Sequence, residues 1–410
     1  MKIFSRFIQG HQAQGLMNDA VLSREARWLL YVQGLFNLGN GLAGLFVNIY
    51  LWKLHPQMRI IALYNLFVFS TVLLAFPVWG WLAKKKNSIL CLILGMMFYS
   101  IFYLAILALK EKVINYLFVF GMLMGAAISS TALAYHVLTY DTTDNKNRDL
   151  FYGLNGLIGS LIGMAAPLFS GWVIVAFKEM MGYRVIFLIS TSLLVFSGVA
   201  SLVLAMPAPR QDYRFFKVLA TKNRDWRRIM AAMGILGLRD GIFVFIVNLL
   251  VFINTRSELS LGGYSFLTST LGLLSFYIVG KNLQPEKRIV YSFVGAIMLA
   301  LATFVLAFSR TIQGILVFGV INAVFNPLWS IPSSSLSFQA IGNDPDSSVL
   351  RLEYIVVREI PLNLGRISSL AIFLVLEERM GSEELIRGIL LVLGLVFLAA
   401  WFQLKGVGKE

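Results

Sequence analysis

An arginine and an aspartate stand side by side in the middle of an apolar stretch, Ile229 to Asn254. About 20 apolar residues cross the hydrocarbon core of a bilayer, so Arg239 and Asp240 are predicted to lie deep within a membrane helix. An ionisable side chain there is unfavourable by about 2.5–3.5 kcal/mol on insertion scales, and it persists where it faces protein or water. Two interpretations follow: a buried ion pair that only holds helices together, or part of a substrate or proton site.

A second charged row lies in residues 353–376. At 100° per residue Glu359, Asn363 and Arg366 share one helix face, and Arg358 is predicted to point roughly 100° away from Glu359. Arg366 is too deep to reach the membrane surface. Arg358 could extend to that surface or pair with Glu353.

The side chains predicted at this depth carry one excess positive charge, because three arginines accompany the carboxylates Asp240 and Glu359. An unpaired guanidinium in a medium of low dielectric constant favours an anion, and its planar fork fits carboxylate or phosphate. We therefore predict a substrate with an anionic group, bound by Arg239 or Arg366. The two carboxylates are the candidate proton carriers, with facilitated diffusion or coupling to another ion as the rival interpretation.

Rows of amides are the remaining polar feature. On the first apolar span four amides fall within about 80° of one another, and on a later span two more lie four residues apart. Such rows either line a cavity or form hydrogen bonds between helices. The residues are Gln33, Asn37, Asn40 and Asn48 on the first span, and Asn322 and Asn326 on the later one.

The first span recurs within the chain. A shift of 200 residues places Met233–Asn248 over Gln33–Asn48 without a gap, so that Asn40 corresponds to Asp240 and Asn48 to Asn248. Gly80 and Gly95 also recur, as Gly280 and Gly295. Repeats of this kind, related by an axis along the membrane normal, build some transporter folds.

The chemistry of soluble enzymes is not indicated. Cys91 is the only cysteine, the three histidines are far apart, and no phosphate-binding loop of the G-x-x-x-x-G-K-[ST] type occurs. We therefore predict no metal, no cofactor and no enzymatic activity. The net charge of +14 is spread over short loops, which favours membrane topology and anionic lipid headgroups over nucleic acid as its explanation.

Hydrophobic residues make up 58% of the chain and charged residues 14%, which is typical of a protein that crosses the membrane many times. The apolar windows predict an all-α membrane protein with twelve transmembrane helices. A lead-in of residues 1–25 precedes a six-helix bundle over 26–206, a basic linker over 207–228 and a second six-helix bundle over 229–410. The predicted spans are 28–52, 59–82, 88–109, 114–138, 151–176, 183–206, 229–254, 262–280, 289–308, 312–338, 353–376 and 386–404.

Lysine and arginine predict the orientation of these spans. With both termini in the cytoplasm, the cytoplasmic segments hold 22 basic residues and the opposite segments hold 10. Positive residues concentrate on the cytoplasmic side, so lead-in, linker and C-terminus are predicted to be cytoplasmic. We expect the protein in the cell (plasma) membrane.

Two bundles of six helices, a basic central linker and a repeat of 200 residues resemble the major facilitator superfamily (MFS). Its loop between helices 2 and 3, G-x-L-x-D-R-x-G-R-K, is similar to the segment from Gly80 to Asn87, in which Lys84 replaces the aspartate and Lys85 and Lys86 keep the basic character. The resemblance implies a gating loop there and pseudo-symmetric bundles.

The same resemblance implies a secondary transporter that moves a small molecule by alternating access, with helices 1, 4, 7 and 10 around the cavity. We expect the protein to be a monomer. It also places helix 11 beside helix 7, which would bring Asp240 near Arg366 or Arg358. Import or export is left open. A membrane partner or scaffold without transport and a lipid-modifying membrane enzyme are the alternatives.

Overall fold

The computed structural model describes residues 22–144, 147–177, 180–204, 212–221, 223–342, 347–379 and 382–408. This part of the chain is helical and contains no strand. The lead-in predicted for residues 1–25 lies outside it, except for the last four residues. The spanning helices are α3 (Arg24–Leu54), α4 (Met58–Lys85), α5 (Ser88–Leu109), α6 (Leu117–Thr142), α7 (Arg148–Ala176), α8 (Met181–Ser201), α10 (Arg224–Thr255), α11 (Glu258–Asn282), α12 (Arg288–Phe308), α13 (Ile312–Gly342), α14 (Ser347–Glu377) and the pair α15 (Ser382–Gly394) and α16 (Val396–Leu404).

The twelve predicted passes through the membrane are present. Eleven segments in the described residues are long and apolar enough to span a bilayer, and one of them, Ser88–Thr142, contains both α5 and α6, joined by the 3-10 helix η1 (Lys110–Tyr116). The last pass is interrupted at Leu395, between α15 and α16. The prediction of twelve transmembrane helices is therefore confirmed.

Several helices begin before the apolar window that predicted them, because polar residues cap their first turns. The Ser23 hydroxyl accepts a hydrogen bond from the Ala26 amide, and the Asn223 side chain accepts one from the Trp226 amide. The sixth span is shorter than predicted, since α8 ends at Ser201 rather than near 206. Apolar windows locate the membrane core but not the capped ends.

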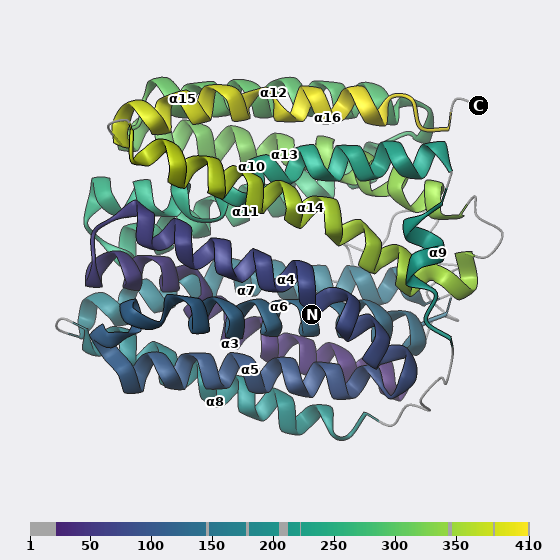
Figure 1. Ribbon diagram of the computed structural model, residues 1–410, viewed down its shortest axis with the longest axis horizontal. Coiled ribbons are helices and arrows are strands. Elements are labelled where there is room, and N and C mark those ends of the chain that lie inside the picture. The colour runs from purple at the N-terminus through teal and green to yellow at the C-terminus, as the bar shows by residue number, and fades with distance from the viewer. Residues whose placement is uncertain are drawn as a thin grey trace, which may run out of the picture.

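Helices far apart in the sequence pack in two groups (Figure 1). The first group comprises α3 to α8 and the second group comprises α10 to α16. In this view α3, α5, α6 and α8 lie on one side, α12, α13, α15 and α16 lie on the other, and α4, α7, α11 and α14 lie between them. The groups meet mainly where α4 packs on α14 and α7 packs on α11. The short helix α9 (Phe215–Leu219) and the C-terminal end of α16 lie at one end of the molecule, called here the linker end; the opposite end is the far end.

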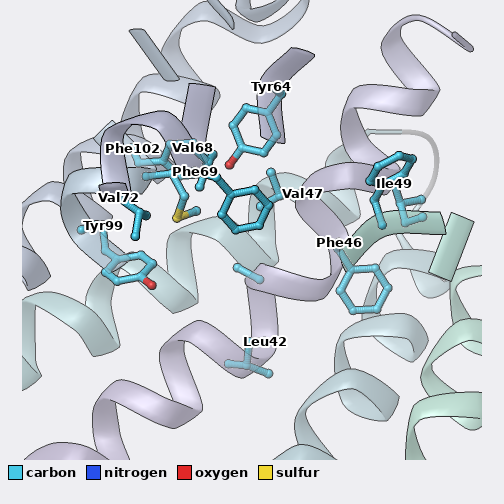
Figure 2. Packing of buried hydrophobic residues seen from close by; sticks show 14 of the residues in the cluster. Leu42, Phe46, Val47, Ile49, Tyr64, Val68, Phe69, Val72, Tyr99 and Phe102 are labelled. Carbon is cyan, nitrogen blue, oxygen red and sulfur yellow. The ribbon is translucent and has the colours of Figure 1, made fainter. Parts of the chain in front are cut away.

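Aromatic and branched side chains fill the spaces between helices of the first group. Figure 2 shows Val47 of α3 near Tyr64 and Phe69 of α4, and the rings of Tyr64 and Phe102 lie 6.3 Å apart. Glycines permit close approach in the same group: a Cβ added to Gly125 of α6 would meet the backbone oxygen of Val68. This packing holds the helices of the first group close together.

Candidate functional site

Asp240 and Arg366 form an ion pair between α10 and α14. The Arg366 Nη2 donates to Asp240 Oδ2 at 3.3 Å, and its Nη1 donates to Asn363 Oδ1 at 3.2 Å. Asn363 is fully buried and donates in turn to the backbone oxygen of Glu359 at 2.8 Å. The pairing of Asp240 with Arg366, one of two partners predicted from the sequence, is therefore present.

Three glycines bring α10 and α14 close enough for this pair. A Cβ at Gly237 would collide with the backbone oxygen of Leu362, and one at Gly365 would collide with that of Gly234. At Gly241 it would meet Arg366 itself. Small residues at a helix contact let the backbones approach, which fixes the register of the two charged side chains.

The ion pair also borders the space between the two groups of helices. The Arg366 guanidinium lies 4.9 Å from the ring centre of Phe69 on α4, in the other group, and its buried Nε has no hydrogen-bond partner among the described residues. The Asp240 side chain is 41% exposed. An ionisable side chain at mid-span persists where it faces protein or water, which agrees with a position of Asp240 at the border between the two groups.

Arg239 points elsewhere, although it adjoins Asp240 in the sequence. Its guanidinium carbon lies 3.9 Å from the ring centre of Phe243 and 4.7 Å from that of Phe397. Its Nη2 donates to Asn322 Oδ1 at 3.4 Å, and the residue is only 9% exposed. Adjacent helical residues diverge by about 100°, which directs Arg239 into its own group of helices.

Three other charged residues of α14, Glu353, Arg358 and Glu359, take partners that the sequence did not indicate. Arg358 lies 3.6 Å from Glu359, because its long side chain bridges the predicted angular separation. Glu353, an expected partner of Arg358, is fully buried and instead accepts a hydrogen bond from Lys84. The predicted row is thus divided between two separate contacts.

The amide rows are also divided. Gln33 donates to Asn37 along α3 at 3.3 Å, whereas Asn48 accepts from Asn65 of α4 at 3.1 Å and so serves contact between helices. The amide of Asn40 folds over Gly44. The side chains of Asn248 and Asn326 are half-buried. Within the described residues no hydrogen bond joins the α3 amides to the charged pair.

The described residues offer no group of three His, Cys, Asp or Glu side chains placed to hold a metal ion. Cys91 is buried, and its thiol lies 3.8 Å from the backbone oxygen of Trp79.

The residues of the predicted gating loop lie in two different environments. Lys84 belongs to the last turn of α4 and is buried, whereas Lys85 and Lys86 are exposed. The Lys84 Nζ donates to Glu353 Oε1 at 2.7 Å and to the backbone oxygen of Val349 at 2.9 Å. A Cβ at Gly80 would meet Val356 at 3.0 Å, so α4 and α14 touch closely at the linker end.

A matching ion pair closes the far end, and the sequence did not reveal it. Lys53 at the end of α3 lies 2.5 Å from Glu258 at the start of α11, and Tyr183 of α8 donates to the same carboxylate oxygen at 2.8 Å. Glu258 is 4% exposed. Both residues fall in predicted short loops, where neither spacing nor periodicity indicates a partner.

The contact between α7 and α11 changes along its length. At the far end a Cβ on Gly171 would collide with the backbone of Glu258, yet at Gly153, five turns away on the same face of α7, no described atom lies within 4 Å. Gly262 and Gly280 of α11 repeat the pattern. The two helices therefore touch at the far end and separate toward the linker end.

Disulfide formation should reproduce this separation in a Cys91→Ser background. Gly163→Cys with Ser269→Cys is expected to oxidise readily, because an added Cβ at 163 would lie 3.7 Å from the Ser269 hydroxyl. Gly159→Cys with Gly272→Cys, about one turn nearer the linker end, should oxidise far more slowly. Copper-phenanthroline oxidation followed by gel mobility measures both; equal rates would contradict the geometry.

Twelve spanning helices in two groups, with ion pairs between the groups at both ends and a charged pair at mid-depth, define a membrane transporter. The chain belongs to the Major Facilitator Superfamily, which it matches over residues 23–344. It is accordingly a secondary transporter, a multi-pass membrane protein, and the resemblance noted in its sequence is confirmed.

Relatives and solved structures agree with this assignment. A Bacillus subtilis (strain 168) protein described as uncharacterized protein YqgE is 33% identical over 394 residues, 96% of this chain and 92% of the relative. A POT family transporter in complex with 5-aminolevulinic acid has a TM-score of 0.72 at 10% identity, over 94% of this chain and 97% of that one. The human organic anion transporter MFSD10 (TETRAN) has a TM-score of 0.65 at 15% identity, over 92% and 99%. The E. coli fucose:proton symporter has a TM-score of 0.66 at 13% identity, over 94% of this chain and 98% of that one.

Proposed function

We propose that the protein moves a small molecule bearing an anionic group, that Arg366 binds this group, and that a proton on Asp240 is the coupling ion. The observation that carries the proposal is the Asp240–Arg366 ion pair at the boundary between the two groups of helices. Protonation of Asp240 removes its negative charge and releases Arg366 Nη2. One proton would thereby prepare the site for one anion.

The surroundings of Arg366 support an approach in the plane of its guanidinium. The Phe69 ring covers one face, Asn363 holds Nη1, and the buried Nε has no described partner. Release of Nη2 would leave two adjacent donors, Nε and Nη2, for a bidentate carboxylate or phosphate. Two structural neighbours are described as an organic anion transporter and a proton symporter, which fits both parts of the proposal.

The other predicted site residues receive supporting roles in this proposal. Gln33, Asn37 and Asn40 would face the neutral part of the substrate, with Asn248 and Asn326 on the opposite side. Arg239 and Asn322 would shape the second group of helices rather than touch the substrate. Arg358 and Glu359, and the pairs at the two ends, would change partners as the site becomes accessible alternately from each side.

We also propose the orientation and surroundings of the molecule. The linker end would face the cytoplasm of the cell, because the basic residues favour this orientation. The six-helix bundles would be 26–206 and 229–410, joined by the cytoplasmic linker 207–228. The protein would act as a monomer in a bilayer with anionic headgroups, without nucleic acid and without enzymatic activity.

Transport by purified protein in liposomes tests the proposal. A panel of radiolabelled carboxylates, phosphate esters, amines and neutral sugars would be offered with and without an imposed pH gradient. We expect accumulation of a compound with an anionic group, and only with the gradient. A substrate that is purely cationic, or accumulation that is indifferent to the gradient, would refute the corresponding half of the proposal.

A further inference from the structure

The short helix α9, between the two groups of helices, presents opposite faces to protein and to solvent. Val218 is 1% exposed and packs beside Trp226 and Phe215 in the core of the second group. Phe216 is 78% exposed, the highest value of any large apolar side chain in the described residues, and Leu219, one turn further, is 45% exposed. An apolar edge of α9 therefore lacks protein cover.

The place of α9 in the chain indicates what covers that edge. Most exposed apolar side chains belong to spanning helices, where lipid tails surround them, but Phe216 does not. The spanning helix α8 ends at Ser201 and the spanning helix α10 begins at Arg224. Since α9 connects these two membrane passes, it lies at the level of the membrane surface. The linker 207–228 contains seven basic and two acidic residues, a composition attracted to anionic headgroups.

The segment leading into α9 covers the ion pair at the linker end. The Arg214 amide donates to Glu353 Oε1 at 2.9 Å, the same oxygen that accepts from Lys84. The Tyr213 hydroxyl packs where a Cβ of Gly80 would stand. Burial, with Glu353 nearby, raises the pKa of this hydroxyl, so that Tyr213 remains neutral against the carboxylate.

We infer that α9 is a membrane-anchored latch. Phe216 and Leu219 insert among the headgroups of the adjacent leaflet, and anionic phospholipid strengthens the insertion through the basic linker. The anchored helix keeps Tyr213 and Arg214 over the Lys84–Glu353 pair and so holds α4 and α14 together. This inference rests on the proposed function only in treating that pair as a gate.

Fluorescence of a label on α9 tests the anchoring. In a Cys91→Ser background, Phe216→Cys would carry an environment-sensitive NBD group in vesicles of phosphatidylcholine, with or without phosphatidylglycerol. We expect emission at shorter wavelength with phosphatidylglycerol. Asp212→Cys is the matched control, since its side chain is 90% exposed in the same segment and should report water in both vesicles. A shift that depends on protein density and not on lipid charge would instead indicate a second copy, and would overturn the inference.

Accessibility of the gate tests the coupling. Ser88 is 4% exposed and lines a cavity of about 150 Å³ together with Lys84 and Arg351. Ser88→Cys should react with a water-soluble maleimide roughly tenfold faster in phosphatidylcholine than with phosphatidylglycerol present, because local opening becomes more frequent when the latch is released.

The double variant Phe216→Ser, Leu219→Ser should keep the fast rate in both vesicles. Equal rates for Ser88→Cys with and without anionic lipid, while the protein remains folded by circular dichroism, would overturn the coupling. Neither experiment uses a substrate or a pH gradient. A failure of the anion and proton proposal would therefore leave both results unchanged.

Discussion

Lys84→Met is expected to destabilise the protein by about 3–5 kcal/mol, because it leaves the fully buried carboxylate of Glu353 without its cation. Only the Arg214 amide would remain as a described donor to that carboxylate. The Lys84 side chain is itself 6% exposed, so water cannot replace it without opening the contact between α4 and α14. The thermal unfolding midpoint in detergent measures the loss.

Lys85→Met is the matched control, since the neighbouring lysine is exposed and should change stability by less than about 1 kcal/mol. Adding Glu353→Gln to Lys84→Met should restore most of the stability. Glutamine keeps an oxygen for the Arg214 amide, and replacing both members of a buried ion pair is often neutral. A double variant no more stable than Lys84→Met would show that the lysine acts through packing rather than charge.

The positions of the ion pairs at the two ends indicate which of them must break when the linker end opens. Lys53–Glu258 joins α3 to α11 at the far end, and Lys84–Glu353 joins α4 to α14 at the linker end. The contact of α4 with α14 extends along both helices. It begins at the far end, where Arg59 lies 2.7 Å from Glu378, and continues to Lys84 at the linker end. Since α7 and α11 already separate toward the linker end, opening on that side requires rupture of only the Lys84–Glu353 contact among these pairs.

The sequence could predict those features that depend on length, composition and periodicity. Apolar windows locate the twelve passes. The row of Glu359, Asn363 and Arg366 on α14, together with the resemblance, indicates a contact with Asp240. Few charged partners lie at the depth of Asp240, so Arg366 and Arg358 are the two predicted partners. Repeat and basic linker indicated where the chain divides.

The sequence could not predict which partner each remaining charge takes. Arg239 and Asp240 have the same depth, yet one enters a cage of Phe243 and Phe397 while the other faces the inter-group space. That difference depends on the rotation of α10 about its axis, which follows from packing of every neighbour. Glu258 and Lys53 are far apart in sequence and fall between the predicted spans, where no helical period is available to indicate the direction of a side chain.

Asp240→Asn should separate anion binding from proton coupling. Asparagine imitates the neutral, protonated side chain, so Arg366 stays available at every pH. The anion identified by the transport panel should therefore bind roughly 10- to 150-fold more tightly than to the wild type at alkaline pH, since a charge-assisted hydrogen bond contributes about 1.5–3 kcal/mol. Isothermal calorimetry as a function of pH should show a wild-type affinity that falls as pH rises and a variant affinity that does not change.

Transport in liposomes completes this prediction, because a carrier without its titrating group can exchange substrate but not accumulate it. Asp240→Asn should retain exchange of labelled for unlabelled anion and lose accumulation driven by a pH gradient. Glu359→Gln is the matched control, since it removes a neighbouring carboxylate and leaves the Asp240–Arg366 contact intact. Arg366→Gln should lose both binding and exchange while remaining folded, because the arginine is 22% exposed and its removal leaves Asp240 hydrated. Full gradient-driven accumulation by Asp240→Asn would exclude Asp240 as the proton carrier, and unchanged affinity in Arg366→Gln would exclude this arginine as the anion site.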